Sequence, residues 1–140
     1  MTSYQIFLVK SSWVIVTKMN QETIGSLFYN RLFEIAPEVK PMFSRTPLPE
    51  QSKKLLSMLS YIVNKLDKLD EIIDEVKKLA QRHVQYGVTD DQYMMVGGAL
   101  LWTLEKGFGN NWTPDLRTAW MDCYMLLSDA MITSTKVAVA

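Results

Sequence analysis

The chain has 140 residues, 48% of them hydrophobic, and its 15 acidic and 15 basic residues balance to a net charge of zero. This length suits one domain with a sizeable core, and the balanced charge provides no long-range attraction to nucleic acid or to an anionic membrane. The only cysteine, Cys123, excludes an internal disulfide, and the N-terminus lacks the features of a signal peptide. The longest apolar run, Met94 to Trp102, is shorter than the roughly 20 residues that span a bilayer. We therefore expect one cytoplasmic domain over residues 1–140, without nucleic-acid or membrane partners.

Helical periodicity runs through nearly the whole chain. Apolar residues recur at three- and four-residue intervals over residues 4–18 and 21–35, and Asn20 is suited to cap the second of these helices. Pro37 ends that helix, and a short turn-like segment follows to Phe43. No window favours a strand, so the pattern predicts an all-α fold.

The second half of the chain carries start and stop signals for further helices. A long helix is expected from Leu48, followed by DKLDE as a polar connection and by the helix that contains His83. The remaining signals are Gly87 as a stop, the capping box TDDQ (residues 89–92) opening a helix to about Gly107, and Thr113–Pro114 opening a last helix to about Thr135. The result is a domain of six or seven helices.

His83 is the only histidine in the chain, and it continues an apolar stripe. Counting from Ile72, intervals of 4, 7, 8 and 11 residues give Val76, Leu79, Ala80 and His83. An inward imidazole must satisfy two ring nitrogens. It is either a core histidine bonded to a carbonyl and a neighbouring tyrosine, or an axial haem ligand with one nitrogen on iron. Periodicity alone leaves both interpretations open.

Several motifs in order resemble the globin family over about residues 4–133. They are Trp13 in the first helix, IGSLFYNRLFEIAP (24–37), Phe43 in EVKPMF, EQSKKLLSML with Gln51, LAQRHVQYGV with His83, DDQYMMVGGALL, and RTAWMDCYMLLSDAMI. The pattern is most similar to bacterial single-domain globins of the flavohaemoglobin branch, including the Hell's Gate type, which pairs a distal Gln with a Tyr. The resemblance implies a globin fold, a three-on-three helical sandwich enclosing haem b.

The resemblance also implies roles for individual residues. His83 would be the iron ligand, and Tyr29, Gln51 and Leu55 would face the bound gas, with Tyr29 and Gln51 donating hydrogen bonds to it. The residues expected to contact the haem are Phe43, Lys54, Leu55, Leu79, His83, Val88 and Tyr93. Gly25 and Ser52 are small residues where two globin helices cross closely.

The proximal side of the expected pocket departs from the flavohaemoglobin pattern. Tyr93 matches a tyrosine ten residues after the histidine, but Thr135 stands where that pattern has a glutamate near the end of the last helix. The backbone carbonyl of Leu79 is then the expected hydrogen-bond acceptor for His83. A neutral acceptor makes the imidazole a weaker electron donor to iron, which disfavours O–O cleavage and hence peroxidase chemistry. Because no second histidine exists, we expect a sixth iron position that is open or occupied by water.

These features favour high-affinity binding of dioxygen for storage, delivery or scavenging, and NO or CO would compete for the same position. One alternative is nitric oxide dioxygenation with a separate reductase, because the chain has no room for a flavin or nicotinamide domain. Two others are a haem-based gas sensor that needs an output partner and a helical interaction module without haem. Whether the protein is an enzyme stays open at this point.

Overall fold

The computed structural model describes residues 1–139, which form helices and no strands. In chain order the elements are α1 (Ser3–Thr17), α2 (Gln21–Ile35), η1 (Pro37–Phe43), α3 (Leu48–Asn64), η2 (Leu66–Ile72), α4 (Ile73–Gln85), α5 (Asp90–Phe108), η3 (Gly109–Asn111) and α6 (Pro114–Val139), where η denotes a 3-10 helix. The expected all-α fold is confirmed, and the helix starts fall within two residues of the expected positions.

The capping signals act as the sequence predicts. The Asn20 side chain accepts a hydrogen bond from the Thr23 backbone N–H at 2.9 Å, and Thr89 forms a reciprocal capping box with Gln92. Thr113 Oγ1 accepts from the Leu116 backbone N–H at 3.1 Å, immediately before the Pro114 start of α6. Gly87 ends the α4 turn with a φ of 82°, a conformation that costs glycine little.

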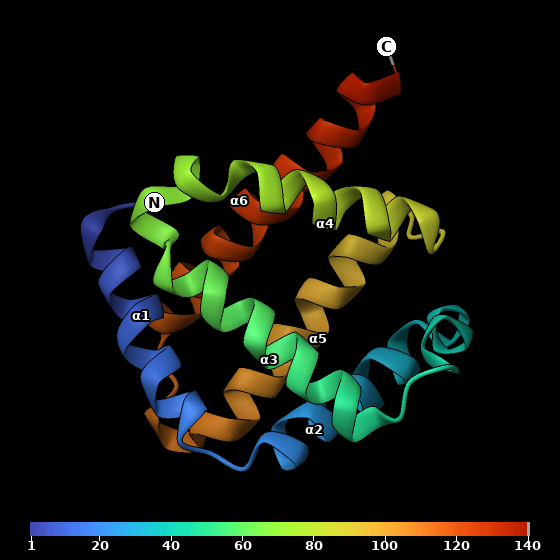
Figure 1. Ribbon diagram of the computed structural model, residues 1–140. Coiled ribbons are helices and arrows are strands. Elements are labelled where there is room, and N and C mark those ends of the chain that lie inside the picture. Colours follow the sequence, from blue (N-terminus) through green and yellow to red (C-terminus); the bar gives the residue numbers. More distant parts are fainter. Residues whose placement is uncertain (140) are drawn as a thin grey trace.

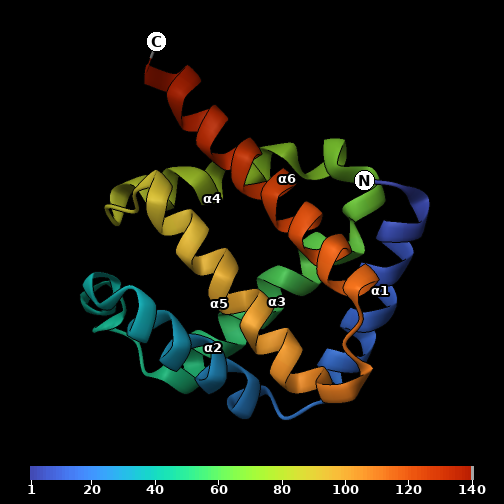
Figure 2. The ribbon, with the colours of Figure 1, turned by 180° about the vertical axis from the view of Figure 1, so that it is seen from behind.

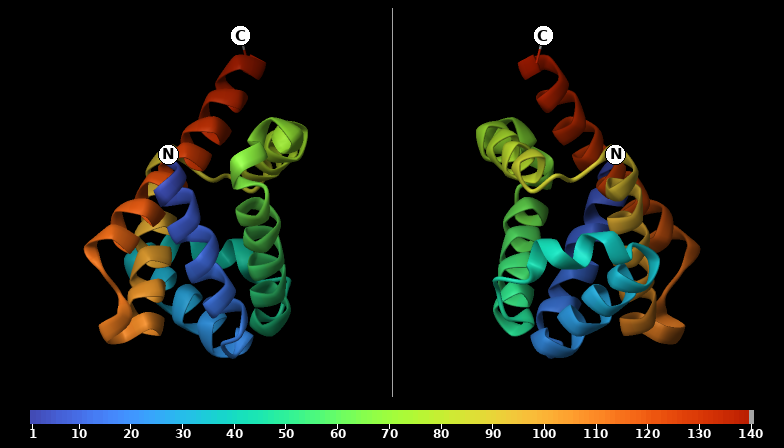
Figure 3. Two further views of the ribbon diagram at one scale, coloured as in Figure 1. Left: turned by 90° about the vertical axis from the view of Figure 1, so that its left-hand side faces the viewer. Right: turned by 90° about the vertical axis from the view of Figure 1, so that its right-hand side faces the viewer.

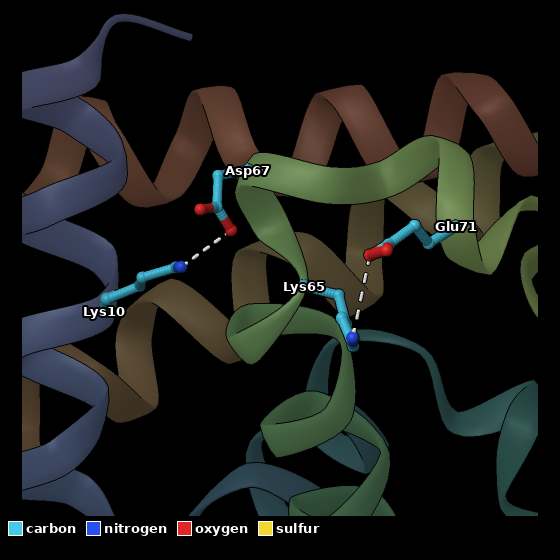
Figure 4. Close-up of polar contacts among 4 residues, drawn as sticks. All are labelled: Lys10, Lys65, Asp67 and Glu71. Atoms are coloured by element: carbon cyan, nitrogen blue, oxygen red, sulfur yellow. Dashed lines mark hydrogen bonds and ion pairs between the residues drawn. The ribbon is translucent and has the colours of Figure 1, made fainter.

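One segment differs from expectation. DKLDE lies within η2 and is more than a polar connection, because Leu66 and Ile72 at the two ends of η2 are buried. Two ion pairs hold its polar side (Figure 4): Lys10 Nζ of α1 lies 2.8 Å from Asp67 Oδ1, and Lys65 Nζ lies 3.7 Å from Glu71 Oε2. The hydrogen bond from Lys10 lowers the pKa of the exposed Asp67 carboxyl.

The helices form two layers. Seen from the side, α3 and α4 lie on one side of the molecule and α5 and α6 on the other (Figure 3). Helix α2 crosses between them and packs against both α3 and α5, while α1 packs against α3 and α6. The C-terminal part of α6 extends past α4 at the edge of the molecule (Figures 1 and 2). This is the three-over-three arrangement that the sequence resemblance implies.

The buried side chains form two apolar clusters. The larger one joins α1, α2, α3, α5 and α6 around Trp13, Phe28, Leu32 and Trp120, and a smaller one joins α3, η2, α4, α5 and α6 around Ile62, Ile72 and Tyr93. Helix α3 contributes to both clusters. Among residues 1–139, no helix combines the length and the apolarity that crossing a bilayer requires.

Candidate functional site

His83 lies in the last full turn of α4 and is half-buried. Its Nδ1 lies 2.8 Å from the Leu79 backbone carbonyl, so this nitrogen carries the proton and donates, which leaves Nε2 with a free lone pair. Burial lowers the pKa of His83, the Leu79 bond opposes that effect, and nearby Arg82 adds to it. The imidazole is therefore held neutral and oriented, the form in which histidine binds a metal.

Tyr93 in the first turn of α5 packs against this histidine. The two rings stack with their centroids 5.8 Å apart and their planes 20° apart. The turn at Gly87 brings the start of α5 back beside the end of α4, and Val88 in that turn packs in the same apolar cluster as Tyr93 and Leu79. Four of the expected proximal residues are thus brought together.

A residue that sequence reasoning left without a role fixes the position of Tyr93. The Tyr124 hydroxyl of α6 donates to the Tyr93 backbone carbonyl at 2.5 Å. The Tyr124 ring also lies against Gly97, where an added Cβ would come within 2.6 Å of it. The only sequence signal is the glycine pair in MMVGGALL, since a glycine inside a helix often marks a close approach.

Tyr29 of α2 is the centre of a second set of side chains. It is 2% exposed, and its ring packs edge-on against Phe28 at 4.9 Å and against Phe43 at 5.2 Å. Burial raises the pKa of Tyr29 to about 12, and a hydrogen bond with the Gln51 side chain opposes that rise. Tyr29 therefore keeps its hydroxyl proton at neutral pH and stands next to an amide, as a pair of hydrogen-bond donors requires.

A close crossing of α2 and α3 brings this pair together. A Cβ added to Gly25 would lie 1.9 Å from Ser52 Oγ and 2.2 Å from Ser52 Cβ, so only glycine fits here. Ser52 is 1% exposed, and its hydroxyl donates to the Leu48 carbonyl at 2.8 Å. Because Tyr29 follows Gly25 by one helical turn and Gln51 precedes Ser52 directly, the crossing sets their separation.

The remaining predicted residues lie around these two sets. Phe43 and Leu55 are partly buried and pack against the larger cluster, whereas Lys54 is exposed on α3. Thr135 does not take over the role of a carboxylate, because its hydroxyl donates to the Ile132 carbonyl at 2.8 Å. Tyr29 and Phe43 belong to the larger apolar cluster, whereas Tyr93, Leu79 and Val88 beside His83 belong to the smaller one.

Comparison with known proteins identifies the family. The sequence model of the Globin family matches residues 26–131, about three quarters of the chain. This chain is a globin. It is 34% identical over 136 aligned residues to the protein named Anaerobic nitrite reductase GLB0 from Physcomitrium patens, covering 87% of this chain and 75% of that protein. The structure of a bacterial globin from Campylobacter jejuni matches with a TM-score of 0.85 and 29% identity, covering 99% of both chains.

Flavohemoproteins are also similar to this globin. The one from Bacillus subtilis (strain 168) is 31% identical over 129 residues, which cover 91% of this chain but only 32% of the flavohemoprotein. The globin thus matches about a third of that relative's length. The expected family is confirmed, and the finer assignment to the Hell's Gate type stays a prediction.

The residues present fit the cofactor of the family, which is haem. A neutral imidazole with Nδ1 engaged and Nε2 free is the donor that haem iron takes on its proximal side. Half-buried apolar side chains next to both sets, Phe43, Leu55, Leu79 and Val88, are of the kind that cover a porphyrin face. The globin therefore binds haem, and gas binding at that haem is its function in general terms.

Proposed function

We propose that this globin binds dioxygen reversibly and tightly, with His83 as the iron ligand and with Tyr29 and Gln51 donating hydrogen bonds to the gas. When bound, haem supplies an iron whose sixth position accepts a diatomic gas. The observation that carries the proposal is the buried Tyr29 beside the half-buried Gln51, because a phenol hydroxyl buried among aromatic rings needs a hydrogen-bond partner that offsets its desolvation.

Tyr29 and Gln51 would each donate a hydrogen bond to the bound gas. The Gln51 amide has two N–H donors and the Tyr29 hydroxyl has one, so each side chain keeps a donor for the ligand even where the two interact with each other. Dioxygen held at haem iron would be a better hydrogen-bond acceptor than carbon monoxide, so donors at Tyr29 and Gln51 would favour dioxygen. A hydrogen bond to such an acceptor contributes ~1.5–3 kcal/mol, which corresponds to about a ten- to hundredfold slower release.

The proximal side favours binding over O–O cleavage. His83 donates to a neutral backbone carbonyl, so its imidazole carries less negative character than one paired with a carboxylate. The haem contacts proposed for Phe43, Lys54, Leu55, Leu79, Val88 and Tyr93 would hold the cofactor, with Lys54 at its exposed edge.

The test is the dioxygen dissociation rate of the haem-loaded protein by stopped-flow mixing. Tyr29→Phe and Gln51→Leu should each release dioxygen about ten- to hundredfold faster and carbon monoxide nearly unchanged. Because the two side chains interact with each other and would donate to the same ligand, the double variant should fall short of the product of the single effects. Tyr61→Phe, on the exposed face of α3, is the control and should leave the rate unchanged. Unchanged dioxygen release in both single variants would refute the proposal.

Nitric oxide dioxygenation is a second candidate, which the similarity to flavohemoproteins supports. It would use the same donors but needs reducing equivalents at every turnover, which a reductase would supply. NO consumption by the dioxygen-loaded globin separates the two functions. Consumption that stops at one NO per haem, even with a reductase and nicotinamide cofactor added, favours binding alone, and sustained turnover favours the enzyme.

A further inference from the structure

The outward face of α1 carries four large, exposed aromatic or aliphatic side chains. Tyr4, Phe7, Val14 and Ile15 are 57%, 62%, 52% and 51% exposed. At 100° per residue these four side chains and Ser11 fall on one stripe of the helix, which we call the α1 outer stripe. Helix α1 runs across the foreground in the left panel of Figure 3, between α3 and α6, against both of which it packs.

The opposite side of the same helix is also apolar. Val9, Trp13 and Val16 are at most 3% exposed and form part of the main core. Lys10 is the only charged residue in α1, and it lies between the two faces and pairs with Asp67. Apolar side chains on two opposite faces of one helix are normally covered on both, so the outer stripe is suited to a partner.

We propose that the outer stripe binds the same stripe of a second copy of this chain, antiparallel, with a two-fold axis at Ser11. The spacing is self-complementary about that residue. Phe7 lies four residues before Ser11 and Ile15 four after it, so the phenylalanine of each copy meets the isoleucine of the other. Tyr4 lies seven before, opposite Lys18 seven after, which sets an ammonium over an aromatic ring.

Ser11 suits the centre of such a contact. Its side chain is small, so two helices can approach closely there. Its hydroxyl already donates to the Phe7 carbonyl of its own helix at 2.7 Å, so burying Ser11 in the contact would leave no unpaired donor. A two-fold contact of identical patches closes after two copies, which gives a dimer and no larger assembly.

Charge and area favour a second copy over a membrane. The chain has no net charge and the stripe has no row of basic residues, in contrast to helices that lie on anionic lipid. A fully exposed aromatic side chain presents ~150–250 Å², and an aliphatic one somewhat less. Multiplied by the exposed fractions of the four side chains, these areas give an exposed surface of about 400 Å² per copy. Two copies would bury about 800 Å² of apolar surface, the size of a weak, reversible protein interface. We therefore infer a weak dimer that dissociates on dilution.

Sedimentation velocity of the haem-loaded full chain, from low to high micromolar concentration, tests the dimer. The wild type should pass from monomer to dimer, and Phe7→Lys and Ile15→Glu should each weaken association at least tenfold. Tyr61→Lys is the matched control, because it places the same charge on a 40% exposed aromatic of α3 outside the stripe, and it should dimerise like the wild type. Circular dichroism should be unchanged in all of them, because every substituted side chain faces outward.

Mixing the variants tests the register. In an antiparallel pair of one Phe7→Lys chain with one Ile15→Glu chain, the introduced lysine meets the introduced glutamate, and the remaining phenylalanine meets the remaining isoleucine. The mixture should therefore dimerise where neither variant does alone.

The proposal would be overturned by a wild type that stays monomeric at every concentration, by single variants that still dimerise, or by a mixture that stays monomeric. Binding of a monomeric wild type to phosphatidylcholine vesicles, lost in Phe7→Lys, would assign the stripe to a membrane and overturn it too. Haem spectra and gas release are separate readouts, so failure here leaves the proposed function untouched.

Discussion

Replacing Gly25 with alanine probes the contact that holds the proposed donor pair together. The added methyl carbon would lie 1.9 Å from Ser52 Oγ and 2.2 Å from Ser52 Cβ, against ordinary contacts of 3.4–4 Å. Because the obstructing Cβ is fixed to the α3 backbone, α2 and α3 must move apart by more than an ångström. Overpacking of this kind costs about 3 kcal/mol or more. The higher helix propensity of alanine offsets ~1 kcal/mol of this cost, so the free energy of unfolding should fall by about 2–3 kcal/mol.

Thermal unfolding of the haem-loaded protein measures this loss. Gly25→Ala should lower the Tm by roughly 5–10 °C and speed dioxygen release, since Tyr29 and Gln51 both lie next to the crossing. The double variant Gly25→Ala/Ser52→Gly exchanges the small residues across the contact and should recover most of both properties. Gly98→Ala is the control, because nothing lies within 4 Å of its added Cβ, and it should be neutral or slightly stabilising. A Gly25→Ala protein that unfolds like the wild type, or a double variant no more stable than the single one, would contradict a tight contact between Gly25 and Ser52.

Two further predictions concern the tyrosines. Gly97→Ala should displace the Tyr124 ring, which would lie 2.6 Å from the added Cβ, and thereby loosen Tyr93. We expect a lower Tm and a shifted iron–histidine band in the Raman spectrum. A spectrum like that of Gly98→Ala would contradict this prediction. The wild type should lose stability relative to Tyr29→Phe as the pH rises from about 10 to 12, because unfolded Tyr29 ionises near 10.0 and folded Tyr29 holds its proton to about 12. Parallel alkaline denaturation curves for the two proteins would disprove that assignment.

The helices and their caps follow from local sequence, and the structure bears this out. Asn20 and Thr89 cap helices through bonds to residues three positions away, so a short window contains both partners. The sequence pattern does not predict the 3-10 helix η2, because charged residues dominate DKLDE. Leu66, Leu69 and Ile72 nevertheless repeat every third residue, and all three are at least partly buried. A three-residue period inside a polar stretch is the signal that was available.

The candidate site needed more than local sequence. Periodicity placed His83 on an inward stripe but left its role open, and the Leu79 bond was predictable because it joins residues one turn apart. The Tyr124–Tyr93 bond spans 31 residues, and the contact of Gly25 with Ser52 joins two helices. Such pairings depend on how whole helices cross, which composition and spacing do not determine. For Gly25 and Ser52 the order of the family's motifs supplied the expectation that the structure confirms.

The most direct test of the account is the absorption spectrum of the haem-loaded wild type and of His83→Gly, each recorded with and without imidazole. The wild type should show a Soret band with one haem per chain and a ferrous carbon monoxide form with a histidine on the opposite side. His83→Gly should lose that spectrum, and added imidazole should restore it by entering the space that the side chain leaves. A His83→Gly protein that keeps the wild-type spectrum without imidazole, or a wild type with no Soret band, would contradict the assignment of His83 as the haem ligand.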